Sequence, residues 1–278
     1  MERRLFLCLA SAAYALLGPA HSTAWGPLGH ATIGNAAVQQ LDASKRGQLM
    51  KILSVKSDDE LSEVVSEACF WPDTVRNSPE WSWSAPLHYV NIPRSAHRYD
   101  RQRDCRDGMC VTEGVLKYAA ELGRPGLDSE RRREAFAWLC HLVADLHQPL
   151  HAGFRDDRGG NRVHIVYHGE QSNLHRFWDS LLVNDRLPDE QSRALAVEAA
   201  AGHPTESRWN PAEVARWTNE SHALAAERAY PSGSAIDAAF EEASWAIIQR
   251  QWRRAAGRLA AVLGEVLPTN PMQAAEAD

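Results

Sequence analysis

The chain has 278 residues, of which 44% are hydrophobic and 24% are charged. This composition supports a buried core and excludes a disordered or low-complexity protein. The formal net charge of −6 argues against broad electrostatic attraction to nucleic acid, although bound divalent cations would reverse the sign locally.

The N-terminus predicts an export signal. A short charged start at residues 2–4 precedes an apolar run over 5–17 that is too short to span a bilayer, and small residues at 22–24 predict cleavage after Ala24. The mature chain would begin at Trp25, carry 28 basic and 35 acidic residues, and be secreted or periplasmic. No other apolar run is long enough for a membrane-spanning helix, so we expect no membrane partner.

Helical signals dominate the rest of the chain, where capping residues, glycines and prolines bound most segments. The predicted helices run from the Asp58-Asp59 cap to near Phe70 before Pro72, from Thr112 to Leu122, from Asp128-Ser129 to about His147, from Asn173 to Leu182, from Asn210-Pro211 onward, and from Ala235 to Leu263. Only residues 161–169 alternate like a strand, which predicts a small hairpin. We therefore expect a signal peptide at 1–24, one mainly α domain over 25–267, and a flexible tail at 268–278.

Four cysteines would remain after cleavage, in an oxidising compartment. Cys105 and Cys110 flank a short loop whose glycine permits a tight turn, which predicts a disulfide. Cys69 and Cys140 either pair with each other or stay as buried thiols. No CxxC pair occurs, so a zinc-finger site is not indicated.

The stretch "HLVADLHQPLH" concentrates potential metal ligands. His141 and Asp145 are four residues apart on a predicted helix, so they share one face and can bind one metal ion. Pro149 ends the helix, and His151 can then reach a second point nearby. His147 lies roughly 200° around the helix from Asp145 and is a poor ligand candidate.

A second stretch, "NLHRFWDS", repeats the spacing with His175 and Asp179. Further candidate ligands stand in short motifs elsewhere: Asp73 in "WPD", His88 in "PLHYVN", His30 in "WGPLGH", and the free amine and carbonyl of a mature Trp25. Imidazoles and carboxylates without thiolates suit hydrolytic zinc.

In their order, "WGPLGH", "WPDTVR", "LHYVN", "HLVADLHQPLH", "GGN" and "NLHRFWD" resemble the S1/P1 nuclease family of trinuclear zinc enzymes. The resemblance covers residues 25–179, and the helical C-terminal third is similar in character. It implies a mainly α, single-domain phospholipase C/P1 nuclease-like fold with a small hairpin, and three Zn²⁺ ions per chain.

The resemblance also implies a ligand set. One zinc would be held by Asp73, His88, His141 and Asp145, and a second by His151, His175 and Asp179. The third would be held by the amine and carbonyl of Trp25 together with His30, and Asp145 would bridge it to the first. Asp73 and Asp145 thereby belong to the catalytic centre.

Three more residues receive roles from the resemblance. Arg76 would neutralise charge on the phosphoryl oxygens, and Tyr89 would stack on an unpaired base. Asn91 stands where fungal members carry an aspartate that pairs with a base edge, so it would contact a base edge with a different base preference. Asn161 in "GGN" is expected to support the site. The implied activity is zinc-dependent endonucleolytic hydrolysis of single-stranded DNA and RNA to 5′-phosphorylated products, with 3′-nucleotides as further substrates.

Two alternatives stay open. A zinc-dependent phospholipase C would share the metal set but would need a headgroup pocket and an interfacial apolar patch. A non-enzymatic exported zinc-binding protein would have no reason to place Arg76 and Tyr89 beside ligands. We expect no obligate protein partner and a monomer. DNA versus RNA preference, base preference, pH optimum, and glycosylation at the Asn219 sequon stay open.

Overall fold

The computed structural model describes residues 25–202 and 208–268. The predicted signal peptide 1–24 lies outside the described residues, as does the predicted tail beyond its first residue.

Helices make up almost all the regular structure of the described residues. The α-helices are α1 (Gly26–Gln39), α2 (Ala43–Leu53), α3 (Asp58–Val75), α4 (Arg101–Asp104), α5 (Val111–Leu122), α6 (Ser129–Leu146), α7 (Leu174–Arg176), α8 (Leu182–Arg186), α9 (Glu190–Ala201), α10 (Val214–Arg228) and α11 (Ala238–Val266). Shorter helical segments are η1 (Ser82–His88), η2 (Pro149–Ala152), the π-helical turn η3 (Phe177–Leu181), and η4 (Pro211–Glu213). The mainly α fold class is confirmed.

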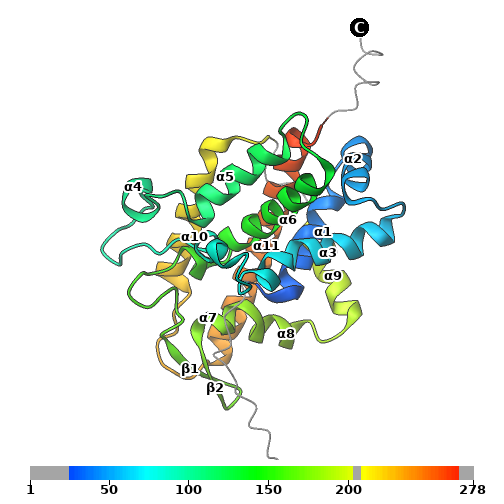
Figure 1. Cartoon of the computed structure of the whole chain (residues 1–278). Coiled ribbons are helices and arrows are strands. Elements are labelled where there is room, and N and C mark those ends of the chain that lie inside the picture. The colour runs from blue at the N-terminus through cyan, green and yellow to red at the C-terminus, as the bar shows by residue number, and fades with distance from the viewer. Residues whose placement is uncertain (1–24, 203–207, 269–278) are drawn as a thin grey trace, which may run out of the picture.

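Helix α6 forms the centre of the bundle. Every residue from Ala135 to Leu146 is buried, because other helices cover α6 on all sides. Figure 1 shows α5 and α10 on one side of α6 and α1 and α3 on the other, and α11 also packs against it. The polar side chains of α6 therefore lie inside the molecule.

The predicted hairpin is present but is displaced along the chain. Strand β1 (His164–Tyr167) pairs antiparallel with β2 (Glu170–Asn173), so the second strand lies beyond the predicted range. His168 and Gly169 form the turn with positive φ values of 50° and 84°, as the preferred two-residue hairpin turn requires.

The predicted end of the helix near Phe70 is wrong. Helix α3 continues through Pro72 to Val75, although Pro72 has no N–H to donate to the carbonyl of Ala68. The last turn stays helical because Pro72 and Asp73 are both buried against the bundle. The start also differs, since Ser57 rather than Asp58-Asp59 caps the helix by accepting from the Glu60 amide.

Two helix boundaries follow the predicted signals, since Asp128 caps α6 and Gly123 follows the last residue of α5. The last helix differs from the predicted range of Ala235 to Leu263, because Asp237 caps α11 and the helix continues to Val266. Asn173 also caps a helix, but that helix passes through the π-helical turn and ends at Arg186 rather than Leu182. In residues 25–202 and 208–268, no helix is both long and apolar enough to cross a membrane.

Candidate metal centre

Helix α6 places one histidine and one aspartate on the same buried face. His141 and Asp145 are four residues apart, and both side chains are fully buried. Asp145 Oδ2 lies 3.1 Å from His141 Nε2 and 3.1 Å from Nδ1 of His88, the last residue of η1. His141 Nε2 and His88 Nδ1 are 2.8 Å apart. Potential ligand atoms from two elements therefore converge on one point.

Helices α1 and α3 add two residues to this group. Asp73 Oδ1 lies 3.6 Å from His88 Nδ1 and 3.8 Å from His141 Nε2. His30 Nε2 lies 3.4 Å from Asp145 Oδ1, and the His30 ring stacks on His141 with 4.2 Å between centroids. We call these five residues cluster A: His30, Asp73, His88, His141 and Asp145.

Cluster B consists of His151 on η2, His175 on α7 and Asp179 on η3. His175 Nε2 lies 3.2 Å from Asp179 Oδ2, and His151 Nε2 lies 4.0 Å from Asp179 Oδ1. The two imidazole rings stack with 5.0 Å between centroids. His151 Nδ1 is 3.8 Å from Asp145 Oδ2, so cluster B adjoins cluster A. The π-helical turn that carries Asp179 is a feature often found at functional sites.

Main-chain carbonyls orient three of the candidate ligand histidines. An Nδ1–H that donates to a carbonyl leaves the Nε2 lone pair directed at the cluster, as in many zinc sites. The contacts are His141 to Cys69, His151 to His88, and His175 to Gly159, at 2.9, 2.5 and 2.5 Å.

Gly159 rather than Asn161 supports the site from the "GGN" motif. Gly159 has φ +60°, and a Cβ there would overlap the Leu150 carbonyl oxygen, so only glycine brings its own carbonyl to His175. Asn161 is exposed, and its amide donates to the Arg158 carbonyl at 2.9 Å.

Sequence reasoning missed Gln148. Its Nε2 donates to Asp179 Oδ1 at 2.6 Å, and its Oε1 accepts from the Leu150 amide at 2.5 Å. The buried amide therefore holds Asp179 against the loop that carries His151. The available signal was its position between the predicted ligands Asp145 and His151.

The side chains of the two clusters fit a cation, since several of their buried atoms make no hydrogen bond. Buried polar atoms without a partner are costly, and a divalent cation can satisfy imidazole nitrogen and carboxylate oxygen together. The atoms are both ring nitrogens of His30, both carboxylate oxygens of Asp73, His88 Nε2, Asp145 Oδ1 and His151 Nε2. Arg76 approaches Asp73 as an ion pair, without the geometry of a hydrogen bond.

Burial also shifts the protonation of these groups. It raises the pKa of Asp73 to about 7 and the pKa of Asp145 well above its usual value. It lowers the pKa of His30 and His88 well below theirs, which keeps both imidazoles neutral. Neutral imidazoles are competent ligands, and the carboxylates ionise readily only beside a positive charge.

Trp25 lies at the start of α1 with its side chain fully buried. The indole Nε1 donates to the Ala144 carbonyl at 2.8 Å, and the ring packs edge-on against Trp252 at 5.9 Å. The Trp25 carbonyl accepts from the Gly29 amide at 3.2 Å. The side chain therefore anchors the beginning of α1 to α6 at Ala144, the residue before Asp145.

The predicted substrate-contacting residues lie around cluster A rather than in it. Arg76 Nη1 is 3.1 Å from Asp73 Oδ1, and 11% of the Arg76 side chain is exposed. Tyr89 directly follows His88 and is 41% exposed, while its carbonyl is held by the Val111 amide at 3.2 Å. Asn91 is half-buried, and its carbonyl accepts from Arg155.

Both cysteine pairs of the described residues are disulfide-bonded. Cys105 joins Cys110 across the short loop, and Cys69 on α3 joins Cys140 on α6. The second bond decides between the two possibilities that the sequence left open for those cysteines.

A third group of possible ligands, His168, Asp185 and Glu241, lies beside the hairpin. His168 and Asp185 are exposed, and Arg186 donates to Glu241 at 2.8 Å. A guanidinium already balances this carboxylate, so the group is an ordinary surface ion-pair cluster.

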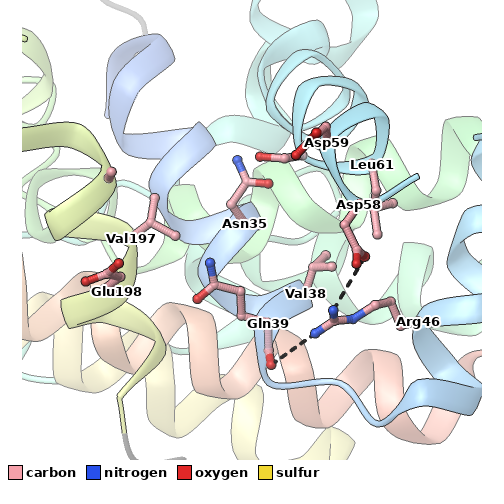
Figure 2. A pocket seen from close by; sticks show the side chains of 11 residues that line it. Asn35, Val38, Gln39, Arg46, Asp58, Asp59, Leu61, Val197 and Glu198 are labelled. Carbon is pink, nitrogen blue, oxygen red and sulfur yellow. Dashed lines mark hydrogen bonds and ion pairs between the residues drawn. The ribbon is translucent and has the colours of Figure 1, made fainter. Parts of the chain in front are cut away.

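A cleft of about 400 Å³ lies between α1, α3 and α9, and none of the cluster residues lines it (Figure 2). Its lining residues are Asn35, Val38, Gln39, Arg46, Asp58, Asp59, Leu61, Ser62, Ala194, Val197 and Glu198. Arg46 reaches Asp58 and the Gln39 carbonyl, both at 3.5 Å. The cleft is separate from clusters A and B.

The fold and the clusters define a mainly helical enzyme of the metal-dependent hydrolase class. The profile of the family described as S1/P1 Nuclease matches residues 25–268. The chain is 28% identical to Endonuclease 4 of Arabidopsis thaliana over 277 residues, which cover 90% of this chain and 91% of the relative. It is 29% identical to Nuclease P1 of Penicillium citrinum over 234 residues, covering 76% and 84%. It is 29% identical to Nuclease S1 of Aspergillus oryzae over 203 residues, covering 72% and 66%.

The chain therefore belongs to the S1/P1 nuclease family. It is accordingly a zinc-dependent nuclease that hydrolyses phosphodiester bonds.

Proposed function

We propose that the chain is an exported endonuclease that cleaves single-stranded DNA and RNA to 5′-phosphorylated products and also hydrolyses 3′-nucleotides. The observation that carries this proposal is the convergence of the two clusters. Eight buried histidine and aspartate side chains come together from seven separate elements, at the positions of the family motifs.

Three zinc ions are proposed for these ligands. Asp73, His88, His141 and Asp145 would hold one, and cluster B would hold the second. His30 would hold the third together with the amine and carbonyl of a mature Trp25, with Asp145 shared. Bound zinc supplies Lewis acidity and an acidified water molecule for phosphodiester hydrolysis.

Arg76 is proposed to neutralise the charge that develops on the phosphoryl oxygens. Its guanidinium is tethered by Asp73 at the rim of cluster A and is part-exposed, so it can also reach a bound phosphate. A planar fork of N–H donors suits phosphate oxygens, and a fixed donor stabilises the transition state more than a solvated one.

Tyr89 and Asn91 are proposed to select an unpaired base. The Tyr89 ring is exposed beside a ligand, while its main chain is fixed by the Val111 amide. Stacking requires a free base face, which favours single strands. The Asn91 amide offers one donor group and one acceptor to a base edge.

Export and the free N-terminus belong to the same proposal. Residues 1–24 would be removed as a signal peptide, residues 25–267 would form the domain, and two disulfides suit an oxidising compartment. A residue retained ahead of Trp25 would convert the amine to an amide. We expect such a chain to bind one zinc fewer, by mass spectrometry, than the chain that begins at Trp25. Equal zinc content in both would remove Trp25 from the ligand set.

The test is digestion of single-stranded and duplex DNA and of RNA by the mature, zinc-loaded chain, with and without a chelator. We expect chelator-sensitive cleavage of the single strands with 5′-phosphate ends, and phosphate release from 3′-nucleotides. Failure of the zinc-loaded chain to cleave any nucleic acid would overturn the proposal. Hydrolysis of phosphatidylcholine by that same inactive preparation would establish the phospholipase alternative.

A further inference from the structure

Three helices that carry ligands of cluster A meet at the Cys69–Cys140 disulfide. The bond joins α3 to α6 across 71 residues of sequence, and both cysteines are fully buried. Helix α1 contacts the same sulfurs at Gly34, where a Cβ would lie 2.6 Å from Cys69 Sγ and 3.2 Å from Cys140 Sγ. The absence of a side chain at Gly34 thus lets α1 approach the cross-link.

Each contact point of the disulfide lies within one helical turn of a cluster A ligand. Gly34 follows His30 by four residues, and Cys69 precedes Asp73 by four. Cys140 directly precedes His141, and the carbonyl of Cys69 accepts the Nδ1–H of His141 at 2.9 Å. The cross-link therefore fixes the distance between two helices and also the donor–acceptor pair that orients one ligand ring.

We propose that the Cys69–Cys140 disulfide, with Gly34 packed against it, positions the zinc ligands of cluster A. This inference rests on the proposed zinc-dependent function and adds positioning residues to it. Without the bond, α3 and α6 can shift, the Cys69 carbonyl can leave His141, and the imidazole loses its fixed orientation. Loss of such a supporting contact weakens metal affinity by about 10–100-fold.

Cluster B lacks this support and provides an internal reference. Its residues lie on η2, α7 and η3, and its histidines are oriented by the carbonyls of His88 and Gly159. Neither carbonyl belongs to a disulfide-bonded residue. A cross-link that positions ligands should thus affect cluster A selectively, whereas one that only stabilises the fold should affect both clusters equally.

The test measures zinc affinities of the full mature chain and of its Cys69→Ala/Cys140→Ala variant by chelator competition, with bound ions counted by native mass spectrometry. We expect the two zincs of cluster A to bind about 10–100-fold more weakly in the variant, while the zinc of cluster B keeps its affinity. The matched control is Cys105→Ala/Cys110→Ala, which removes a disulfide that joins no two ligand-bearing helices and should leave all three affinities unchanged.

Gly34→Ala provides a second route that keeps the disulfide. The added Cβ would press on both sulfurs and on Val65 Cγ1, and we expect the same selective weakening of cluster A. In the Cys69→Ala/Cys140→Ala background the sulfurs are gone, so Gly34→Ala should have a smaller effect there. If the Cys69→Ala/Cys140→Ala variant does not fold, Gly34→Ala is compared with the wild-type chain instead. The criterion is again weaker zinc binding at cluster A with unchanged binding at cluster B.

Equal weakening of all three zincs would overturn the positioning role, as would unchanged affinities in both variants. Either result leaves the proposed function intact, provided that the wild-type chain binds zinc and cleaves single strands. A wild-type chain that binds no zinc would overturn the proposed function together with this inference.

Discussion

Two polar regions of helix α6 illustrate what distinguishes a metal site from a structural network. Both are buried, and each contains a histidine: His141 lies within α6, and His147 is the C-cap residue of the same helix. His141 faces a group of side chains in which several buried atoms lack a hydrogen bond. His147, as its spacing predicts, points to the other side of the helix.

The His147 region contains its own counter-groups. His147 Nδ1 donates to the Val143 carbonyl at 2.7 Å, and its Nε2 accepts from Arg258 at 2.9 Å. Arg258 in turn donates to Glu220 at 2.6 Å, and Gln251 donates to the His147 carbonyl at 2.9 Å. Burial alone therefore does not mark a functional histidine. What distinguishes the two regions is whether the surrounding protein already supplies hydrogen-bond partners for the ring nitrogens and counter-charges for the nearby ionised groups.

Asp145→Asn should give the largest effect in the molecule. The asparagine keeps the shape of a side chain that lies between His30, His88 and His141, but it removes the negative charge that a shared ligand supplies. We expect nuclease turnover to fall by roughly 10³-fold or more, because Lewis-acid stabilisation is worth several kcal/mol. Steady-state kinetics on single-stranded DNA measure this loss. Retention of a tenth of the wild-type rate would contradict the role of Asp145.

Arg76→Ala should come next. Removing one preorganised donor typically lowers kcat by about 10²–10³-fold, and the zinc content should stay unchanged because Arg76 is not a ligand. The control is Arg131→Ala, since Arg131 is an exposed residue paired with Asp128. If both arginine variants lose the same activity, the effect of Arg76 is not specific to the site.

Tyr89→Ala should have a smaller and substrate-selective effect. Stacking on one base is worth about 1–3 kcal/mol, so single-strand binding should weaken by about 5-fold to 150-fold. The rate on a small phosphodiester without a base should be unchanged. Leu195→Ala, which shortens another exposed apolar side chain, should change neither quantity. Equal losses on both substrates after Tyr89→Ala would argue against stacking.

His147→Gln should leave activity intact and change only the pH dependence of stability. Burial, together with the Arg258 charge, lowers the pKa of His147 well below its usual 6.5. Below pH 6.5 the unfolded chain therefore binds a proton that the folded chain does not, and stability falls as the pH falls. The Gln variant lacks this loss, so its free energy of unfolding should improve relative to wild type as the pH falls below 6.5, by at most about 1.4 kcal/mol per pH unit. The measurement is denaturant titration of both chains between pH 5 and 8. If the prediction is wrong, their free energies of unfolding will differ by the same amount at every pH.

The sequence predicts which histidines and aspartates lie together better than it predicts the contacts that hold them in place. The spacing of His141 and Asp145 is a local property of one helix, and the structure places both on one face. The boundary at Pro72 was wrong because tertiary packing of Asp73 outweighs the hydrogen bond that proline removes. Helix α1 was not predicted, since Gly29 and Gly34 lower its helix propensity and are used for close packing.

The pairing of Cys69 with Cys140 could not be predicted for a related reason. The two cysteines are 71 positions apart in the sequence, so their contact depends on how α3 packs on α6 and not on local pattern. Gln148 was missed similarly, because its role depends on Asp179 approaching from a different element. The sequence therefore predicts individual helices better than it predicts the contacts between them.

The most direct test of the contrast within α6 is native mass spectrometry of zinc bound to Asp145→Asn and His147→Gln, beside the wild-type mature chain. We predict three zinc ions on the wild-type chain, three on His147→Gln, and loss of cluster A zinc from Asp145→Asn. Equal zinc content in the two variants would contradict the account, in which the face with His141 and Asp145 binds metal and the His147 region is structural.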